Sequence, residues 1–154
     1  MNKKRQILVS LATALTIFFS IQSVLAHVTI SPRESTTGAS ETYTIRVPTE
    51  RGSPTVRIEI EFPMGVTISN IEATSGWDVE ATTNGDGRIE SAVWSGGSIA
   101  QGESEEFKFT AENPSEEDSI VWKVVQVHAD GSRAEWIGER GSRNPAPVVE
   151  IQNN

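Results

Sequence analysis

The sequence predicts an all-β fold, an immunoglobulin-like antiparallel β-sandwich that follows a cleaved N-terminal signal peptide. Beyond the N-terminal segment, apolar and polar residues alternate with period two almost everywhere, which is the pattern of strands with one buried face. Turn signals separate these runs, and no window after the N-terminal segment has a helical period. Many short strands joined by regular turns are typical of a sandwich.

Residues 1–26 have the pattern of an export signal. Basic residues at positions 3–5 precede a mostly apolar run over residues 7–21, and Val24-x-Ala26 fits the site that a signal peptidase cuts. The apolar run is short for a membrane span and is interrupted by hydroxyl side chains. We therefore expect an exported protein, periplasmic or extracellular, whose mature chain begins at His27.

The charge and the rare residue types exclude several classes of function. The net charge is -8, and loss of the three basic leader residues moves it to -11. This charge argues against nucleic acid and anionic membranes as partners. The absence of cysteine excludes thiolate metal sites, and it leaves stability to a full-sized hydrophobic core. Only two histidines are present, so a site with three histidine ligands is excluded.

Alternation marks the strands in chain order. The predicted strands cover residues 41–47, 56–62, 77–82, 88–94, 105–111, 120–129 and 133–137. Tight turns are predicted at Pro63-Met64-Gly65, at residues 84–87 and at Asp130-Gly131. The run over residues 120–129 carries bulky side chains on both faces, which predicts a central strand.

One domain is expected over residues 27–140. Within its second predicted strand, Val56, Ile58, Ile60 and Phe62 are expected to face inward. A polar C-terminal tail with two prolines follows over residues 141–154, and its residues 148–151 could add one edge strand.

His27 becomes a different chemical group if the chain is cut before it. A free α-amine and the imidazole Nδ1 of the same residue can close a six-membered chelate ring on a metal ion. Nitrogen donors with an added carboxylate suit Cu(II), which prefers tetragonal N and O ligands. The amine binds only when deprotonated, so affinity should rise with pH near neutrality. The alternative is an ordinary polar residue at a flexible N-terminus.

Several different short motifs follow one another along the mature chain. They are His27-Val28-Thr29-Ile30-x-Pro32, Arg46-Val47-Pro48-Thr49-Glu50-Arg51, Phe62-Pro63-x-Gly65-Val66, Ser75-Gly76-Trp77, Trp94-Ser95-Gly96-Gly97-x-Ile99, and Gln126-x-x-x-Asp130-Gly131 leading to Trp136-x-Gly138. Together they resemble the YcnI-like family, the domain of unknown function 1775.

The resemblance implies an exported, immunoglobulin-like sandwich that binds Cu(II) through a brace with a single histidine. Carried over to this sequence, His27 gives the amine and Nδ1, Glu50 gives a carboxylate oxygen, and Trp136 lies beside the metal. It also implies copper acquisition or delivery, with a copper importer or another copper-handling protein as partner. Many family members carry a C-terminal membrane helix; here we expect no membrane span in the mature chain.

Each of these residues also has a simpler interpretation. Glu50 could be a solvent-exposed loop acid, and Trp136 could belong to the core. We expect Trp77, Trp94 and Trp122 to be core residues or turn anchors. His128 is the rival ligand, although a surface or packing role is favoured. Met64 offers a single thioether, and one such ligand is too few for a Cu(I) site.

The leading interpretation is therefore a copper-binding protein that is not an enzyme. A copper-dependent oxidative enzyme with the same brace and a metal-free structural or adhesive sandwich are the alternatives, because the fold alone does not decide function. In a chain that still carries its leader, the His27 nitrogen is an amide and cannot chelate. Even so, the carried-over site requires Glu50 and Trp136 to lie near His27.

Overall fold

The computed structural model describes residues 27–50 and 52–153 of the 154-residue chain. The expected signal peptide, residues 1–26, lies outside the described residues, as do Arg51 and Asn154. In the described part of the chain, no helix is long and apolar enough to cross a membrane.

The first large sheet has four strands in the order β1-β3-β8-β5. Their bounds are Thr29–Ser31 for β1, Ser40–Pro48 for β3, Ser104–Glu112 for β8 and Thr67–Ile71 for β5. All pairs in this sheet are antiparallel. The alternation predicted for the two long strands is confirmed, since Tyr43, Ile45 and Val47 are buried on β3.

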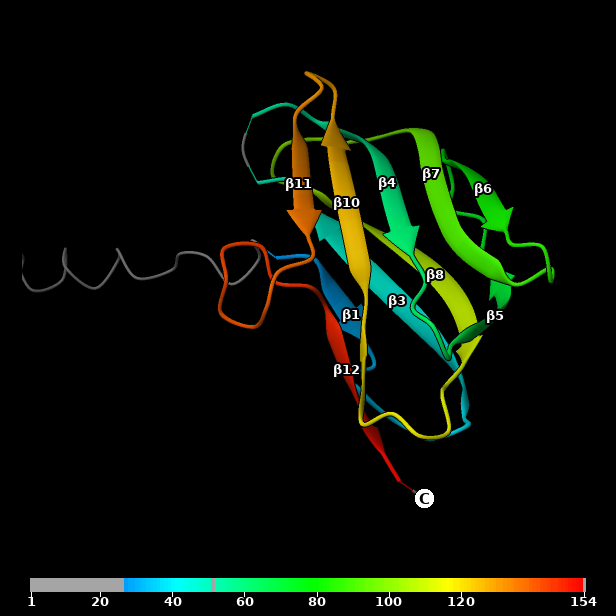
Figure 1. The fold of residues 1–154 in the computed structure, drawn as a ribbon. Coiled ribbons are helices and arrows are strands. Elements are labelled where there is room, and N and C mark those ends of the chain that lie inside the picture. The colour runs from blue at the N-terminus through cyan, green and yellow to red at the C-terminus, as the bar shows by residue number, and fades with distance from the viewer. Residues whose placement is uncertain (1–26, 51, 154) are drawn as a thin grey trace, which may run out of the picture.

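The second large sheet has five strands in the order β11-β10-β4-β7-β6 and faces the first (Figure 1). Their bounds are Arg133–Trp136 for β11, Lys123–His128 for β10, Thr55–Glu61 for β4, Ile89–Ile99 for β7 and Asp78–Thr83 for β6. These pairs are also antiparallel. The predicted antiparallel sandwich is therefore confirmed.

A third, small sheet closes one side of the sandwich. It contains β2 (Glu34–Thr36), β12 (Val148–Gln152) and β9 (Ser119–Val121), in the order β2-β12-β9. The C-terminal strand expected over residues 148–151 exists, but its expected edge position is wrong, because β12 pairs with a strand on each side. Val149 and Ile151 are buried in the core. This burial makes the strand part of the sandwich and not of a tail beyond residue 140.

The single strand expected over residues 120–129 is divided in two at Trp122. The amide of Trp122 donates to the carbonyl oxygen of Pro147 at 2.9 Å, and the chain passes there from the small sheet to the five-stranded sheet. Its second part, β10, lies between β11 and β4. The central position that was expected from its two bulky faces is thus confirmed for residues 123–128.

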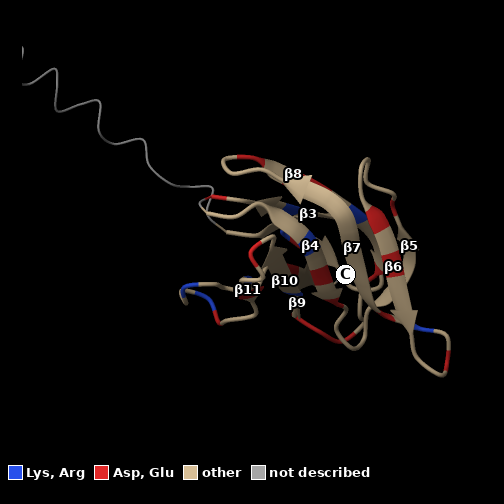
Figure 2. Cartoon of the chain, turned by 90° about the horizontal axis from the view of Figure 1, so that it is seen from above, with Lys and Arg blue, Asp and Glu red and all other residues tan. Residues whose placement is uncertain are grey.

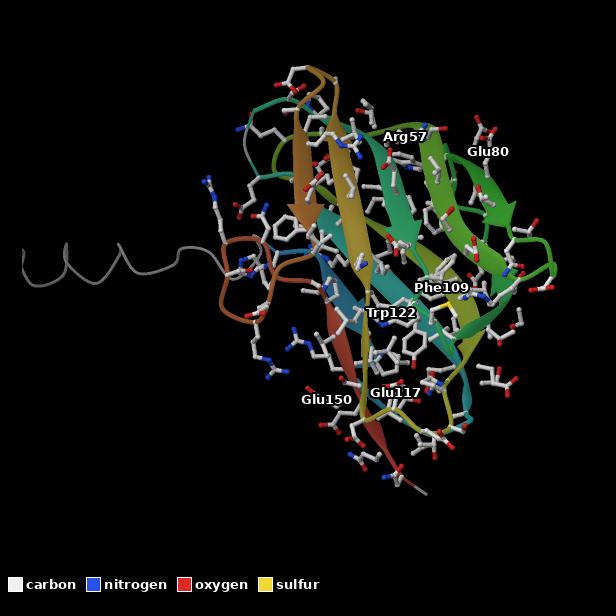
Figure 3. The ribbon with its side chains drawn as sticks, in the orientation of Figure 1. Arg57, Glu80, Phe109, Glu117, Trp122 and Glu150 are labelled. Atoms are coloured by element: carbon white, nitrogen blue, oxygen red, sulfur yellow. The ribbon has the colours of Figure 1, made fainter. Side chains whose placement is uncertain are left out.

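Aromatic side chains fill the space between the sheets. The ring of Trp122 lies 5.1 Å from the rings of Tyr43 and Phe109, and Figure 3 shows Trp122 and Phe109 inside the sandwich. Trp77 and Trp94 each lie 5.2 Å from Phe107. Of the two roles expected for Trp77, Trp94 and Trp122, core residue or turn anchor, the structure shows the core role for all three.

The predicted alternation of β4 is right from Ile58 onward and wrong at its start. The pairing of β4 with β7 is irregular between Thr55 and Arg57. Against β10 this start of β4 carries one extra residue, because Val127 and His128 pair with Arg57 and Thr55. Such a bulge re-aims the neighbouring side chains. As a result Thr55 is fully buried, whereas Val56, which was expected to face inward, is half-buried.

Charged side chains of both signs occupy the outer surfaces. Figure 2 shows basic and acidic residues close together on β4, and acidic residues on β6. On β4 the Nε of Arg57 lies 2.8 Å from a carboxylate oxygen of Glu59, and Arg133 of β11 reaches the other oxygen at 2.8 Å. The outer face of this sheet is thus a solvated ion-pair surface.

Candidate metal centre

His27 and Trp136, far apart in the sequence, face each other at one end of the sandwich. Their ring centroids are 5.7 Å apart and their planes meet at 73°. His27 lies two residues before the start of β1 and is exposed, whereas Trp136 is the last residue of β11 and only 6% exposed. The core therefore fixes an indole beside an accessible imidazole.

The register of β1 brings His27 to the end of β3. Thr29 pairs with Arg46 in antiparallel fashion, and continuing this register by two residues sets His27 opposite Pro48. Glu50 follows Pro48 by two residues and is exposed. Glu50 therefore lies at the same end of the sheet as His27.

A buried amide connects these parts, and in the sequence it is only the first position of the motif Gln126-x-x-x-Asp130-Gly131. Gln126 of β10 is 2% exposed. Its Oε1 accepts a hydrogen bond from Nε1 of Trp136 at 3.1 Å, and its Nε2 donates to the carbonyl oxygen of Pro48 at 2.8 Å. In the sequence, the signal is an amide on the same strand face as Trp122 and Val124, because a polar group there needs buried hydrogen-bond partners.

Two hydroxyl groups complete this buried cluster. Nε2 of Gln126 also donates to Oγ1 of Thr55 at 2.6 Å, and the hydroxyls of Thr55 and Thr49 lie 2.6 Å apart. Both threonines are fully buried. The segment that leads to Glu50 is therefore hydrogen-bonded to the interior and not only to its neighbouring strands.

His128 is held elsewhere by a hydrogen bond of its own. Its Nδ1 lies 2.9 Å from the carbonyl oxygen of Ser53, and because a carbonyl only accepts, Nδ1 donates. Trp136 pairs with Val124, four residues before His128 on the same strand. At about 3.3 Å per residue the two positions are roughly 13 Å apart along the sheet.

Met64 lies at the other end of β4. It follows the last residue of that strand, is 80% exposed, and its sulfur accepts a contact from Nη2 of Arg88 at 3.4 Å. The beginning of the strand, Thr55, belongs to the buried cluster beside Pro48. The thioether is therefore remote from His27.

A groove of about 420 Å³ borders His27 on the side of β1 and β12. Its lining includes the backbone segment 27–30, the two prolines Pro145 and Pro147, and the charged residues Arg33 and Arg140. Arg140 pairs with Glu150 at 2.7 Å. The groove gives solvent and ions access to the imidazole.

Among residues 27–50 and 52–153, no group of three or more His, Asp or Glu side chains is placed to hold a metal ion. Elsewhere in the sandwich, several side chains have shifted pKa values. Hydrogen bonds from Arg133 and Arg57 lower the pKa of Glu59, and hydrogen bonds from the hydroxyl and amide of Ser132 lower that of Asp130. Burial raises the pKa of Tyr43.

Sequence comparison finds two informative matches. The family model described as "Domain of unknown function (DUF1775)" matches residues 27–151. The "Copper-binding protein CutI" of Bacillus subtilis (strain 168) is 33% identical over 138 residues, which cover 88% of this chain and 67% of that protein.

Comparison with solved structures supports the fold. An uncharacterized protein from Nocardia farcinica, described as having an immunoglobulin-like fold, matches with a TM-score of 0.72 and 22% identity, over 82% of this chain and 98% of that one. A cohesin module from a Clostridium perfringens family 33 glycoside hydrolase matches with a TM-score of 0.54 and 14% identity, over 86% of this chain and 100% of that one. At these identities the similarity concerns the fold alone.

Proposed function

The chain belongs to the family described as "Domain of unknown function (DUF1775)", and from this membership we propose that it is an exported protein that binds Cu(II) at its mature N-terminus. The proposed role is to hold or pass the ion outside the cytoplasm, in copper acquisition or delivery, with a copper importer or another copper-handling protein as partner. A relative with 33% identity is named a copper-binding protein, which supports copper as the ion.

The observation that carries the proposal is the contact between His27 and Trp136 at 5.7 Å. It joins the first residue of the expected mature chain to a buried indole that comes from the opposite sheet. In this proposal, cleavage after Ala26 turns the backbone nitrogen of His27 into a primary amine. The amine and Nδ1 then hold Cu(II) in one chelate ring, as suits its preference for nitrogen donors in a square arrangement.

Glu50 is the proposed oxygen donor. Its carboxylate is exposed and lies at the same end of the sheet as His27. A carboxylate adds a hard donor and neutralises one charge of the cupric ion. Such a site needs only one histidine and one acid among its side chains, because the amine is the remaining donor.

Trp136 is the proposed neighbour of the metal and not a ligand. Its Nε1–H is already donated to Gln126, so the indole turns its carbon surface toward His27. An aromatic surface there limits the access of water to one side of the bound ion.

We infer binding and not catalysis. A second imidazole among the ligands would favour oxidative chemistry, but the Nδ1 of His128 already donates to the carbonyl oxygen of Ser53, and the backbone of His128 is roughly 13 Å along the sheet from that of Trp136. The groove beside His27 is the proposed route for the ion.

The test compares two forms of the protein. One begins at His27 with a free α-amine, and in the other the same α-amine is acetylated. Titration with Cu(II) against a competing chelator should give a Kd at least about 100-fold lower for the first form, because an acetylated nitrogen cannot chelate. Equal Kd values would remove the N-terminal site, and mass spectrometry of the secreted protein should show a chain that begins at His27.

A further inference from the structure

The interior beside His27 is unusually polar for a sandwich core. Among the described residues, four buried side chains are polar, and three of them, Thr49, Thr55 and Gln126, form one cluster. Burying an amide is costly unless its groups are paired. In this cluster each atom of the Gln126 amide has a partner.

The partners fix the orientation of the Gln126 amide. The indole Nε1–H of Trp136 can only donate, so it must face Oε1, and the carbonyl of Pro48 can only accept, so it must face Nε2. Turning the amide over would set two donors against each other and two acceptors against each other. The three groups therefore define one arrangement.

This arrangement connects both sheets at the end where His27 lies. Gln126 and Trp136 belong to β10 and β11 of the five-stranded sheet, whereas Pro48 ends β3 of the four-stranded sheet. Thr55 enters the cluster only because the irregular start of β4 turns it inward. One amide thus links the indole beside His27 to the segment that leads to Glu50.

We propose that Gln126 is a positioning residue for the N-terminal copper site. It holds the indole of Trp136 against His27, and it holds the backbone at Pro48 from which Glu50 is presented. An apolar side chain of the same size could fill the space, but it could not orient the indole N–H and the Pro48 carbonyl through hydrogen bonds. The effect on copper binding rests on the proposed function. The placement of the Trp136 ring against His27 applies to the metal-free protein as well.

The test uses the form that begins at His27 and its Gln126→Met variant. Methionine is similar to glutamine in length and volume, but its thioether donates no hydrogen bond and accepts only weakly. The matched control is Tyr43→Phe, which removes another buried hydrogen bond, 2.6 Å long, to Asn113. Tyr43 lies five residues before Pro48 on the same strand, roughly 16 Å away.

The first readout needs no metal. Nuclear Overhauser contacts between the rings of His27 and Trp136 should be present in the unsubstituted protein and in Tyr43→Phe, and lost or strongly weakened in Gln126→Met. If Gln126→Met keeps these contacts at full intensity, the positioning role is overturned, whatever the protein does with copper.

The second readout is the copper site. Loss of a partner that orients a metal-site group commonly weakens metal binding by about 10- to 100-fold. We expect about a tenfold higher Kd for Cu(II) in Gln126→Met with altered electron paramagnetic resonance parameters, and no change of either in Tyr43→Phe. If the ring contacts are lost but copper binding is unchanged, Gln126 does not position groups for the copper site.

A second variant guards against failure to fold. Thr55→Val removes one anchor of the amide and leaves the Trp136–Gln126 hydrogen bond in place. It should raise the Kd a few-fold in the same direction, with the indole Nε1–H resonance retained. If the unsubstituted protein itself binds Cu(II) no better than its N-terminally acetylated form, the proposed function fails, while the ring contacts still decide the role of Gln126.

Discussion

The indole of Trp136 and the imidazole of His27 stand nearly perpendicular, at 73°, with their centroids 5.7 Å apart. One residue ends a strand of the five-stranded sheet and the other precedes the first strand of the four-stranded sheet. Because Trp136 is buried and hydrogen-bonded, it sets the position of the pair, and the exposed histidine remains free to meet an ion.

Glu50→Gln should weaken Cu(II) binding by at least about tenfold in the form that begins at His27. Removal of an outer partner already costs about 10- to 100-fold in metal sites, so the loss of a direct oxygen donor should cost no less. The measurement is a Cu(II) titration with a competing chelator. Glu103→Gln is the control, because this exposed acid lies beside the same segment. Its backbone carbonyl oxygen accepts a hydrogen bond from the backbone amide of Thr49 at 2.9 Å. Equal effects of both substitutions would point to general charge and not to a ligand.

Trp136→Phe should change the electron paramagnetic resonance spectrum of the Cu(II) form, because it alters the wall beside His27 and leaves Oε1 of Gln126 without its donor. The unpaired buried acceptor should also lower the free energy of unfolding by about 1–3 kcal/mol. Trp94→Phe is the matched control, since Nε1 of Trp94 is buried without a partner. It should lower stability and leave the copper spectrum as it is. A spectrum altered equally by both would refute a specific role for Trp136.

Stability should fall in acid in part through Glu59. Arg133 and Arg57 lower the pKa of this carboxyl group. Its contribution is therefore complete above the pKa of the unfolded chain and is lost as the pH falls through the lower pKa of the folded protein. Urea unfolding between pH 7 and pH 2 should show a shallower acid-side decline for Glu59→Gln than for the unsubstituted protein. The difference should be small, below about 1 kcal/mol, because the pair is partly solvated. Identical pH profiles would contradict the assignment.

Gly97→Ala should destabilise the sandwich away from the proposed copper site. A Cβ at this position would overlap the ring of Trp77, so either the ring or β7 must shift, at a cost of about 1–3 kcal/mol. The midpoint of thermal unfolding measures this. Gly85→Ala is the control, because a Cβ there meets nothing within 4 Å. A Tm for Gly97→Ala equal to that of the control would show that the contact with Trp77 can relax freely.

Much of the fold follows from local pattern. Alternation along residues 41–47 and 105–111 predicts which side chains are buried, because neighbouring residues of a strand point to opposite faces. The motifs that identify the family also stand in the sequence as short runs of residue types. The same pattern fails at the start of β4, where the pairing partner introduces an irregularity and Thr55 turns inward in place of Val56.

By itself, the sequence determined that this protein is a β-sandwich without cysteine, that only His27 and His128 can offer imidazole, and that its family is recognisable. Only the tertiary structure decided that Trp136 lies against His27, that Gln126 ties that indole to Pro48, and that β12 lies between two strands. The physical reason is that burial and alternation act on adjacent residues, whereas strand order and hydrogen bonds between sheets join residues far apart in the chain. Such long-range pairings depend on the register of whole strands, which no local run of residues specifies.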